Sequence, residues 1–239
     1  MKGAFLPAIF HVGGMSEKQN QHIDLDPKCE PLFKAKIAEV ATNDDPAHDL
    51  AHFERVVSSA KLLGSIESAD NEVIIPAAWL HDLVNVPKND PRRSQASRLS
   101  AEAARSFLLE IGYLDGNPKR EEKLKAIEHA IEAHSFSAGI KPLTVEAKVV
   151  QDSDRLDALG AIGLARLFIV AGLLKRPIYS MTDPFCYRRE VDDSQFTIDH
   201  VFKKLFVIAE SLQTESGRKE GLRRTNYIRG YLNQLESEI

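Results

Sequence analysis

The sequence predicts an all-α protein, because apolar residues recur at three- and four-residue spacing along most of its 239 residues. No segment of comparable length shows the alternating pattern of a strand. A chain of this length can bury one substantial core, and nothing in the composition requires a second domain. We therefore expect a flexible extension over residues 1–27 and one helical domain over residues 28–239.

The periodicity predicts a helix in each of nine segments: Pro31–Ala41, Ala47–Leu63, Asn71–Val84, Ser94–Ile111, Pro118–His134, Thr144–Ala158, Ala161–Leu173, Thr197–Thr214 and Gly217–Leu235. Side chains that can cap free amides support three of the starts, namely Asp70 or Asn71, Ser94, and Thr144. Two loops, residues 84–93 and 178–195, interrupt the pattern with proline, asparagine and aspartate. Long ordered loops near a site are usually functional.

Composition excludes several classes of function. The net charge of -4 and a pI near 6.1 give no general attraction to nucleic acid or to an anionic membrane. Cys29 and Cys186 lie far apart without zinc-ribbon spacing, which favours a reducing cytoplasm. No apolar run approaches the roughly 20 residues that span a bilayer. Residues 1–14 differ in character from the polar stretch that begins at Met15. Either a short flexible extension or a start codon assigned upstream of the true one at Met15 would explain the difference.

Three separated segments carry the residue types of a metal site. They are residues 48–56 (HDLAHFERV), 80–83 (LHDL) and 151–157 (QDSDRLD). Each lies in a helical context, so the directions of their side chains can be compared. In chain order they offer a histidine, then a histidine and an aspartate, and then an aspartate.

Helix geometry narrows the first two segments. His48 and His52 are one turn apart and share a face that Val56 continues. His81 and Asp82 are adjacent, about 100° apart around a helix, so both can close on one ion from the same helix end.

The third segment leaves a choice between carboxylates. Asp152 and Asp154 point to roughly opposite faces of a helix, whereas Asp154 and Asp157 lie on nearly the same face. Only one of Asp152 and Asp154 can therefore be a ligand.

Imidazole and carboxylate groups together suit a divalent ion and leave coordination positions open for water and an anionic oxygen. Open positions indicate chemistry rather than a purely structural ion. One such segment alone would favour a chance dipeptide or a hydrogen-bonded core histidine, and the three together favour the metal site. The ligand types do not distinguish manganese, magnesium, iron, cobalt, nickel and zinc.

In order and context, the three segments resemble the HD-domain superfamily of metal-dependent phosphohydrolases. The resemblance is closer to its small stand-alone bacterial members, regarded as nucleotide pyrophosphohydrolases or generic phosphohydrolases. It extends through residues 85–97 (NVPKNDPRRSQAS), 129–166 and the later DPF and DHVFKKL segments. It implies an HD-type helical bundle with additional C-terminal helices and a metal-site core at about residues 45–160.

The resemblance also implies a ligand set for one divalent ion. In the family the first ligand is the histidine one turn before a valine, which corresponds to His52, and the last is the aspartate before an arginine or lysine, which corresponds to Asp154. With the adjacent pair, the set is His52, His81, Asp82 and Asp154. His48 and Asp152 are left as substrate-facing or supporting candidates.

A cationic loop comes directly after the His-Asp pair, and its polar residues are Asn85, Lys88, Arg92, Arg93 and Ser97. Lysine and arginine at this distance from a metal suit a phosphate chain, and a helix beginning at Ser94 would add free amides. The alternative is a solvated basic loop, and the adjoining ligands favour the functional interpretation, with Lys88 and Arg93 ahead of Arg92.

Further candidates lie later in the chain. His129 and His134 are about 140° apart around a helix, so they cannot both face one point, and His134 is preferred as a catalytic or substrate contact. Arg155 is a candidate phosphate contact, and Asp157 is a candidate to accept or orient a water proton. His200 and Lys204, one turn apart, could close the pocket, although a surface face is the commoner arrangement. For His129 and His134, the resemblance implies a further role, because extra histidines from this region of related HD proteins assist at the substrate or hold a second metal.

The sequence thus predicts metal-dependent hydrolysis of a phosphoanhydride or phosphoester, with a nucleotide as the small phosphorylated substrate and with Asp82, Lys88, Arg93, His134 and Asp157 in the chemistry. Polynucleotide and membrane partners are not indicated, and the oligomeric state is undetermined. The alternatives are a (p)ppGpp or cyclic-nucleotide hydrolase, a nucleotide-binding sensor with a structural metal, and an oxygenase with a di-iron site.

Overall fold

The computed structural model describes residues 26–41, 49–86, 90–136 and 138–239. Within these residues the secondary structure is helical and no strand occurs, as the periodicity predicts. The helices are α1 (Cys29–Val40), α2 (Leu50–Glu67), α3 (Asn71–Leu80), α4 (Ala96–Glu110), α5 (Arg120–His134), α6 (Val145–Asp157), α7 (Gly160–Leu173), α8 (Phe206–Glu210) and α9 (Glu215–Glu238). A 3-10 turn, η1 (Arg93–Gln95), precedes α4, and a π-helical turn, η2 (Val201–Leu205), precedes α8.

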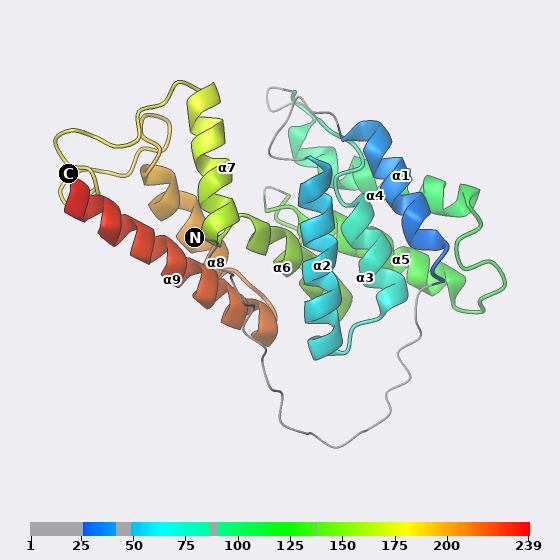
Figure 1. Cartoon of the computed structure of the whole chain (residues 1–239). Coiled ribbons are helices and arrows are strands. Elements are labelled where there is room, and N and C mark those ends of the chain that lie inside the picture. The colour runs from blue at the N-terminus through cyan, green and yellow to red at the C-terminus, as the bar shows by residue number, and fades with distance from the viewer. Residues whose placement is uncertain (1–25, 42–48, 87–89, 137) are drawn as a thin grey trace, which may run out of the picture.

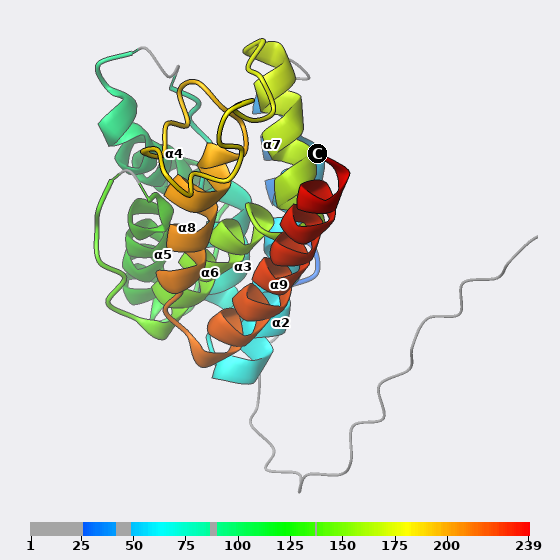
Figure 2. The same ribbon diagram turned by 90° about the vertical axis from the view of Figure 1, so that its left-hand side faces the viewer.

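Helix α6 lies at the centre of the molecule. It packs against α2, α3 and α5 on one side and against α7, α8 and α9 on the other. Figure 1 shows the two groups of helices on opposite sides of α6. Figure 2 shows α8 in front of α6 and α9 running past the end of α2. Side chains on α6 can therefore reach either group.

Buried apolar stripes hold the first group together. On α2 the stripe includes Phe53, Val56 and Ala60, and α3 is buried along its whole length from Glu72 to Leu80. Burial of each such large side chain contributes about 1.5 to 3 kcal/mol relative to exposure. The surrounding core therefore fixes the directions in which the helices point their few polar side chains.

Two of the predicted helix starts are confirmed and one is wrong. Asp70 caps α3 by accepting a hydrogen bond from the Glu72 amide, and Thr144 caps α6 through the Ala147 amide. Ser94 does not begin a helix, because η1 precedes α4 and the residue before Ala96 is Gln95, which makes no side-chain cap. Helix α4 therefore begins two residues later than predicted, directly after the 3-10 turn.

The helix predicted over Asn71–Val84 ends earlier, at Leu80. The Val84 amide donates to the Ser100 hydroxyl on α4 at 3.1 Å rather than continuing the helical ladder. His81 keeps helical backbone angles as the C-cap, so His81 and Asp82 lie in the turn that leaves the helix.

No single helix in the described part of the chain is long and apolar enough to cross a membrane. Only α6 and α7 taken together, bent by 60° at their junction, meet that test on length and composition.

Candidate metal centre

Four helices bring histidine and aspartate side chains to one buried point. His52 lies in the same buried stripe of α2 as Val56, and His134 ends the buried stripe of α5 that includes Ile131. His81 comes directly after the buried helix α3 and is fully buried. Asp154 reaches the point from α6. The helical periodicity that buries each apolar stripe thus also turns these polar groups inward.

The first group consists of His52, His81 and Asp154, whose ligand atoms all lie within 4.8 Å of one another. The His52 and His81 Nε2 atoms are 3.4 Å apart, and the Asp154 Oδ1 atom lies 3.7 Å from His52 Nε2 and 3.8 Å from His81 Nε2. Ligand atoms in neighbouring positions around one ion, each about 2.1 Å from it, are roughly 3.0 to 3.4 Å apart. The group could therefore hold a divalent ion with a small contraction.

A second group shares His81 and adds Asp82 and His134. The Asp82 Oδ2 atom is 3.7 Å from His81 Nε2, and its Oδ1 atom is 3.4 Å from His134 Nε2. Because His81 is common to both groups, the two form one continuous cluster of imidazole and carboxylate atoms, which we call the metal cluster.

The three histidines present the same nitrogen to the metal cluster. An oxygen atom lies against each Nδ1: the Asp157 carboxylate for His52 at 2.8 Å, the Ala78 carbonyl for His81 at 2.8 Å, and the Ile131 carbonyl for His134 at 2.6 Å. An Nδ1–H that donates to such an acceptor leaves the lone pair on Nε2, which is the usual arrangement of metal-ligating histidines. The donor set therefore suits an ion at the centre.

Electrostatics divide the histidines. Burial lowers the pKa of His81 to about 4. Burial alone would also lower the pKa of His134, but its hydrogen bond and charge interaction with Asp82, and the charge of Asp154, outweigh burial and raise that pKa to about 9. Without an ion, burial thus favours the neutral form of His81, whereas Asp82 and Asp154 favour the protonated form of His134.

Asp157 supports the metal cluster from behind. Its carboxylate is buried and binds His52 Nδ1, Arg55 Nε at 2.6 Å and Arg166 Nη1 at 2.5 Å. Burial would raise the Asp157 pKa, but His52 and the two arginines outweigh it and hold the pKa well below its usual range. Asp157 therefore orients His52, and both of its carboxylate oxygens accept hydrogen bonds from these partners. Its expected role in accepting or orienting a water proton stays a prediction.

A cavity of about 310 Å³ opens beside the metal cluster, and we call it the front cavity. Asp154 belongs both to the metal cluster and to the cavity wall. Cationic side chains gather there from the loop before α4, from α6, from α7 and from the C-terminal segment, and the apolar wall comes from α7, η2 and α8. The lining is Arg93, Phe136, Asp154, Arg155, Ala158, Gly163, Arg166, Leu167, Val170, Arg176, His200, Lys204, Leu205 and Ile208.

Comparison with known proteins assigns the fold to a family. The family model described as the HD domain matches residues 49–159. An uncharacterized protein of Bacillus subtilis, YpgQ, is 31% identical over 207 residues, which are 85% of this chain and 90% of YpgQ. The chain belongs to the HD-domain superfamily.

Solved structures of HD-domain relatives agree with this assignment. The crystal structure of B. subtilis YpgQ in complex with ADP is 29% identical, with a TM-score of 0.64 over 89% of this chain and 95% of that chain. An HD-superfamily hydrolase from Bacillus thuringiensis is 26% identical, with a TM-score of 0.67 over 88% of this chain and 96% of that chain. The all-α HD fold and the bacterial stand-alone resemblance predicted from the sequence are therefore confirmed.

The HD segments contain one carboxylate that the structure directs away from the metal cluster. Asp152 is fully buried and accepts hydrogen bonds from the Gln213 amide at 2.8 Å, the Thr214 amide at 2.8 Å and the Thr214 hydroxyl at 2.7 Å. It fastens the start of α9 to α6. Of the two roles left open for Asp152, a position facing substrate does not agree with the structure. The face of α6 that carries Asp152 lies opposite the metal cluster and is covered by the C-terminal segment.

Two other expected substrate contacts have different surroundings. His129 accepts a hydrogen bond from the Leu143 amide at 3.0 Å and so ties α5 to the segment before α6. Ser97 is buried within α4, and its hydroxyl has no hydrogen-bond partner among the described residues. The structure therefore places neither His129 nor Ser97 in the lining of the front cavity.

The remaining predicted residues divide between the front cavity and its surroundings. Arg93 and Arg155 line the cavity, as a role at phosphate requires. Asn85 is exposed on the loop after the His-Asp pair. His48 and Lys88 lie outside the described residues.

Five residues that line the front cavity were not predicted to do so from the sequence: three were not considered, and two were considered more probable as surface residues. Arg166, Arg176 and Phe136 were not singled out, and His200 and Lys204 were weighed as surface residues, but all five line the front cavity. Arg166 had a signal that could have found it, because it is the single charged residue of the otherwise apolar helix α7 (GAIGLARLFIVAGL). A lone cation on an apolar helix requires a buried partner, here Asp157.

Proposed function

We propose that the protein is a metal-dependent hydrolase of a phosphoanhydride or phosphoester and that its substrate is a nucleotide. The proposal rests on the position of Asp154, which belongs to the metal cluster and also lines the cationic front cavity. A substrate held by its phosphates in the front cavity would thus lie against the metal ligands.

The proposed ligands are His52, His81, Asp82 and Asp154. A bound divalent ion would lower the pKa of a coordinated water and polarise a phosphoryl oxygen. His134 lies against Asp82 and is suited to hold a proton near the reacting group, at an Nε2 atom 3.4 Å from Asp82 Oδ1.

The arginines of the front cavity would bind and orient the phosphates. Arg155 is anchored through Nη1 to the Ser211 carbonyl and hydroxyl, at 3.0 and 2.8 Å, while its buried Nε has no hydrogen-bond partner in the described part of the chain. A buried donor without an acceptor is costly, and an anionic oxygen would remove that cost. Arg93 is held through Nη1 by the Val86 carbonyl at 2.6 Å, which keeps its guanidinium at the cavity.

The apolar side of the cavity suits the remainder of a nucleotide. Phe136 lies under the Arg155 guanidinium, 5.4 Å from the ring centroid, and Leu167 and Val170 continue the apolar wall. Flat aromatic and guanidinium surfaces next to aliphatic side chains can hold a base by stacking. The relative YpgQ was crystallised with ADP, which supports this choice of substrate class.

The test is a panel of nucleoside mono-, di- and triphosphates incubated with metal-free protein and then with manganese, magnesium or cobalt in turn. Identification of the products by ³¹P NMR gives the cleavage position. We expect release of phosphate or pyrophosphate that depends on the ion and is absent from Asp154→Asn. Nucleotide binding by calorimetry without turnover under any ion would instead support a sensor, and bound iron with oxygen consumption would support an oxygenase.

A further inference from the structure

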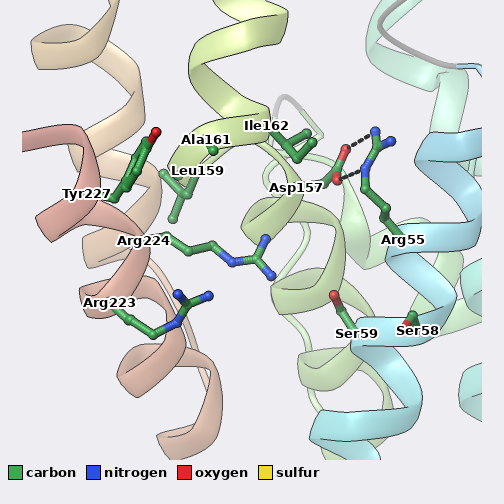
Figure 3. Close-up of a pocket in the computed structure, with 11 residues that line it drawn as sticks. Arg55, Ser58, Ser59, Asp157, Leu159, Ala161, Ile162, Arg223, Arg224 and Tyr227 are labelled. Atoms are coloured by element: carbon green, nitrogen blue, oxygen red, sulfur yellow. Dashed lines mark hydrogen bonds and ion pairs between the residues drawn. The ribbon is translucent and has the colours of Figure 1, made fainter. Parts of the chain in front are cut away.

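A second cationic cavity, of about 460 Å³, lies between α2, α9 and the start of α7. Figure 3 shows its residues, and we call it the back cavity. Its lining consists of Arg55, Ser58, Ser59, Asp157, Leu159, Gly160, Ala161, Ile162, Arg223, Arg224 and Tyr227. None of these residues lines the front cavity. The back cavity is therefore a separate space that the proposed hydrolysis does not use.

Three guanidinium groups face this space. In Figure 3, Arg223 and Arg224 extend from α9 toward α2, and Arg55 extends from α2 toward Asp157. Arg223 and Arg224 both bind Glu220, and Arg55 binds Asp157. The lining itself contains three arginines and one carboxylate, Asp157, and therefore carries a net positive charge.

The guanidinium groups have donors beyond those bonds. Arg55 uses Nε and Nη2 on Asp157, and Arg224 uses Nε on Glu220 and Nη1 on the Leu156 carbonyl at 2.6 Å. Each guanidinium carries five N–H groups in a planar fork, a geometry that matches the oxygens of a phosphate. The carboxylates hold the arginines in place, and N–H groups of Arg55 and Arg224 remain that these bonds do not use.

Neutral donors face the same space from the opposite wall. Ser58 and Ser59 line the cavity on α2, and Figure 3 shows the Ser59 side chain directed toward the cavity. The first residues of α7, Gly160 to Ile162, complete the lining, and the residue before them, Leu159, has no side chain able to cap their amides. The serine hydroxyls and the amides at the start of α7 add to the cationic donors. The NMR signals of these amides would also change when a ligand binds in the cavity.

We propose that the back cavity is a second anion site that takes the phosphate group of a small molecule. Its volume exceeds that of a phosphate ion, and Leu159, Ile162 and the half-exposed Tyr227 give it an apolar and aromatic edge. An organic phosphate therefore uses both parts of the lining. Inorganic phosphate shares the anionic chemistry and uses only the cationic part.

The Asp157 carboxylate connects the back cavity to the metal cluster. Asp157 lines the cavity and binds Arg55 there, and the same carboxylate holds His52 Nδ1 at 2.8 Å. An anion bound to Arg55 would thus lie close to the carboxylate that orients a proposed metal ligand, His52.

Backbone amide NMR tests the site in metal-free ¹⁵N-labelled protein titrated first with inorganic phosphate and then with adenosine 5′-monophosphate. We expect saturable shifts of the Gly160, Ala161 and Ile162 amides. Tighter binding of the nucleotide with added shifts at Tyr227 assigns an organic phosphate, and equal binding without Tyr227 shifts assigns the free ion. Absence of saturable shifts at residues 160–162 with both probes overturns the site, and this outcome is independent of whether the front cavity binds nucleotide.

Matched variants separate the back cavity from general charge effects. Ser59→Asp places a carboxylate in the cavity and should weaken binding at least about tenfold, since like charges at a binding site repel strongly. Ser65→Asp makes the same change on an exposed part of α2 and should leave binding unchanged. Equal binding by Ser59→Asp and Ser65→Asp would contradict the proposal.

A second pair covers the case in which Ser59→Asp fails to fold. The Arg223 side chain is 73% exposed, so Arg223→Gln should fold normally and lose several-fold in phosphate affinity. Lys219→Gln removes a charge from the same helix outside the cavity and serves as its control. Loss of affinity in both variants alike would show that net charge, and not the site, attracts the anion.

Discussion

The two faces of α6 perform different tasks with the same kind of side chain. Asp154 lies in the metal cluster, 3.7 Å from His52 Nε2, while Asp152 holds the start of α9 through three hydrogen bonds. The first carboxylate is partly exposed to the front cavity and the second is fully buried. Position relative to the neighbouring helices, and not residue type, thus decides which carboxylate joins the proposed metal site and which fastens α9 to α6.

The largest expected effect comes from Asp154→Asn. Removal of this proposed ligand should lower metal-dependent turnover roughly a thousandfold or more, because the ion contributes several kcal/mol to the transition state. The melting temperature should change little, since Asp154 lies at the cavity edge. Turnover is measured with the best nucleotide of the panel, and activity equal to that of the wild type would contradict a catalytic role for the cluster.

Asp152→Asn should show the opposite pattern. The new side-chain NH2 group would replace one carboxylate oxygen and would face either the Gln213 amide or the Thr214 amide, both of which now donate to Asp152, so we expect a loss of about 2 to 3 kcal/mol in the free energy of unfolding. Thermal denaturation followed by circular dichroism should show a melting temperature lower by about 5 to 10 °C. Turnover per folded molecule should be unchanged. If this variant instead loses activity without losing stability, the division between the two faces of α6 is wrong.

Asp157→Asn tests a carboxylate that serves both tasks. It keeps the volume of the side chain but removes the charge that holds His52 in place, so the affinity for Mn²⁺ should fall about 10- to 100-fold. Isothermal titration calorimetry measures the change. Asp115→Asn, an exposed carboxylate paired with Arg120, is the control and should bind the ion as the wild type does. Equal affinities in the two variants would show that Asp157 does not support a metal ligand.

The smallest expected effect is a pH dependence of the metal-free protein. The pKa of His134 is raised from 6.5 to about 9, so its protonated form stabilises the fold. This contribution is fully present below pH 6.5 and is lost as the pH rises through 9. Melting temperatures in a chelating buffer should therefore fall by a few degrees between about pH 6.5 and 9.5, and the fall should be smaller in His134→Gln. Parallel curves for the two proteins would contradict this assignment of the titrating group.

Much of the fold could be predicted from the sequence because it depends on local patterns. Apolar periodicity predicted most of the helices, and Asp70 and Thr144 marked two of their starts, but the single helix predicted over Thr197–Thr214 is a π-helical turn followed by the short helix α8. The ends were harder to predict: α3 ends at Leu80, and beyond it the Val84 amide donates to Ser100, a residue 16 positions away. A contact between helices of this kind leaves no local signal.

The candidate site shows the same division. Helical spacing showed which side chains of one segment share a face, and the resemblance to the HD family, rather than the spacing, implied the ligand set His52, His81, Asp82 and Asp154. Tertiary packing alone decided that Asp157 faces two arginines and that Arg166, Arg176 and Lys204 line the same cavity as Asp154. Helix periodicity gives the direction of a side chain around its own axis, but the partner in that direction is set by how distant helices pack together.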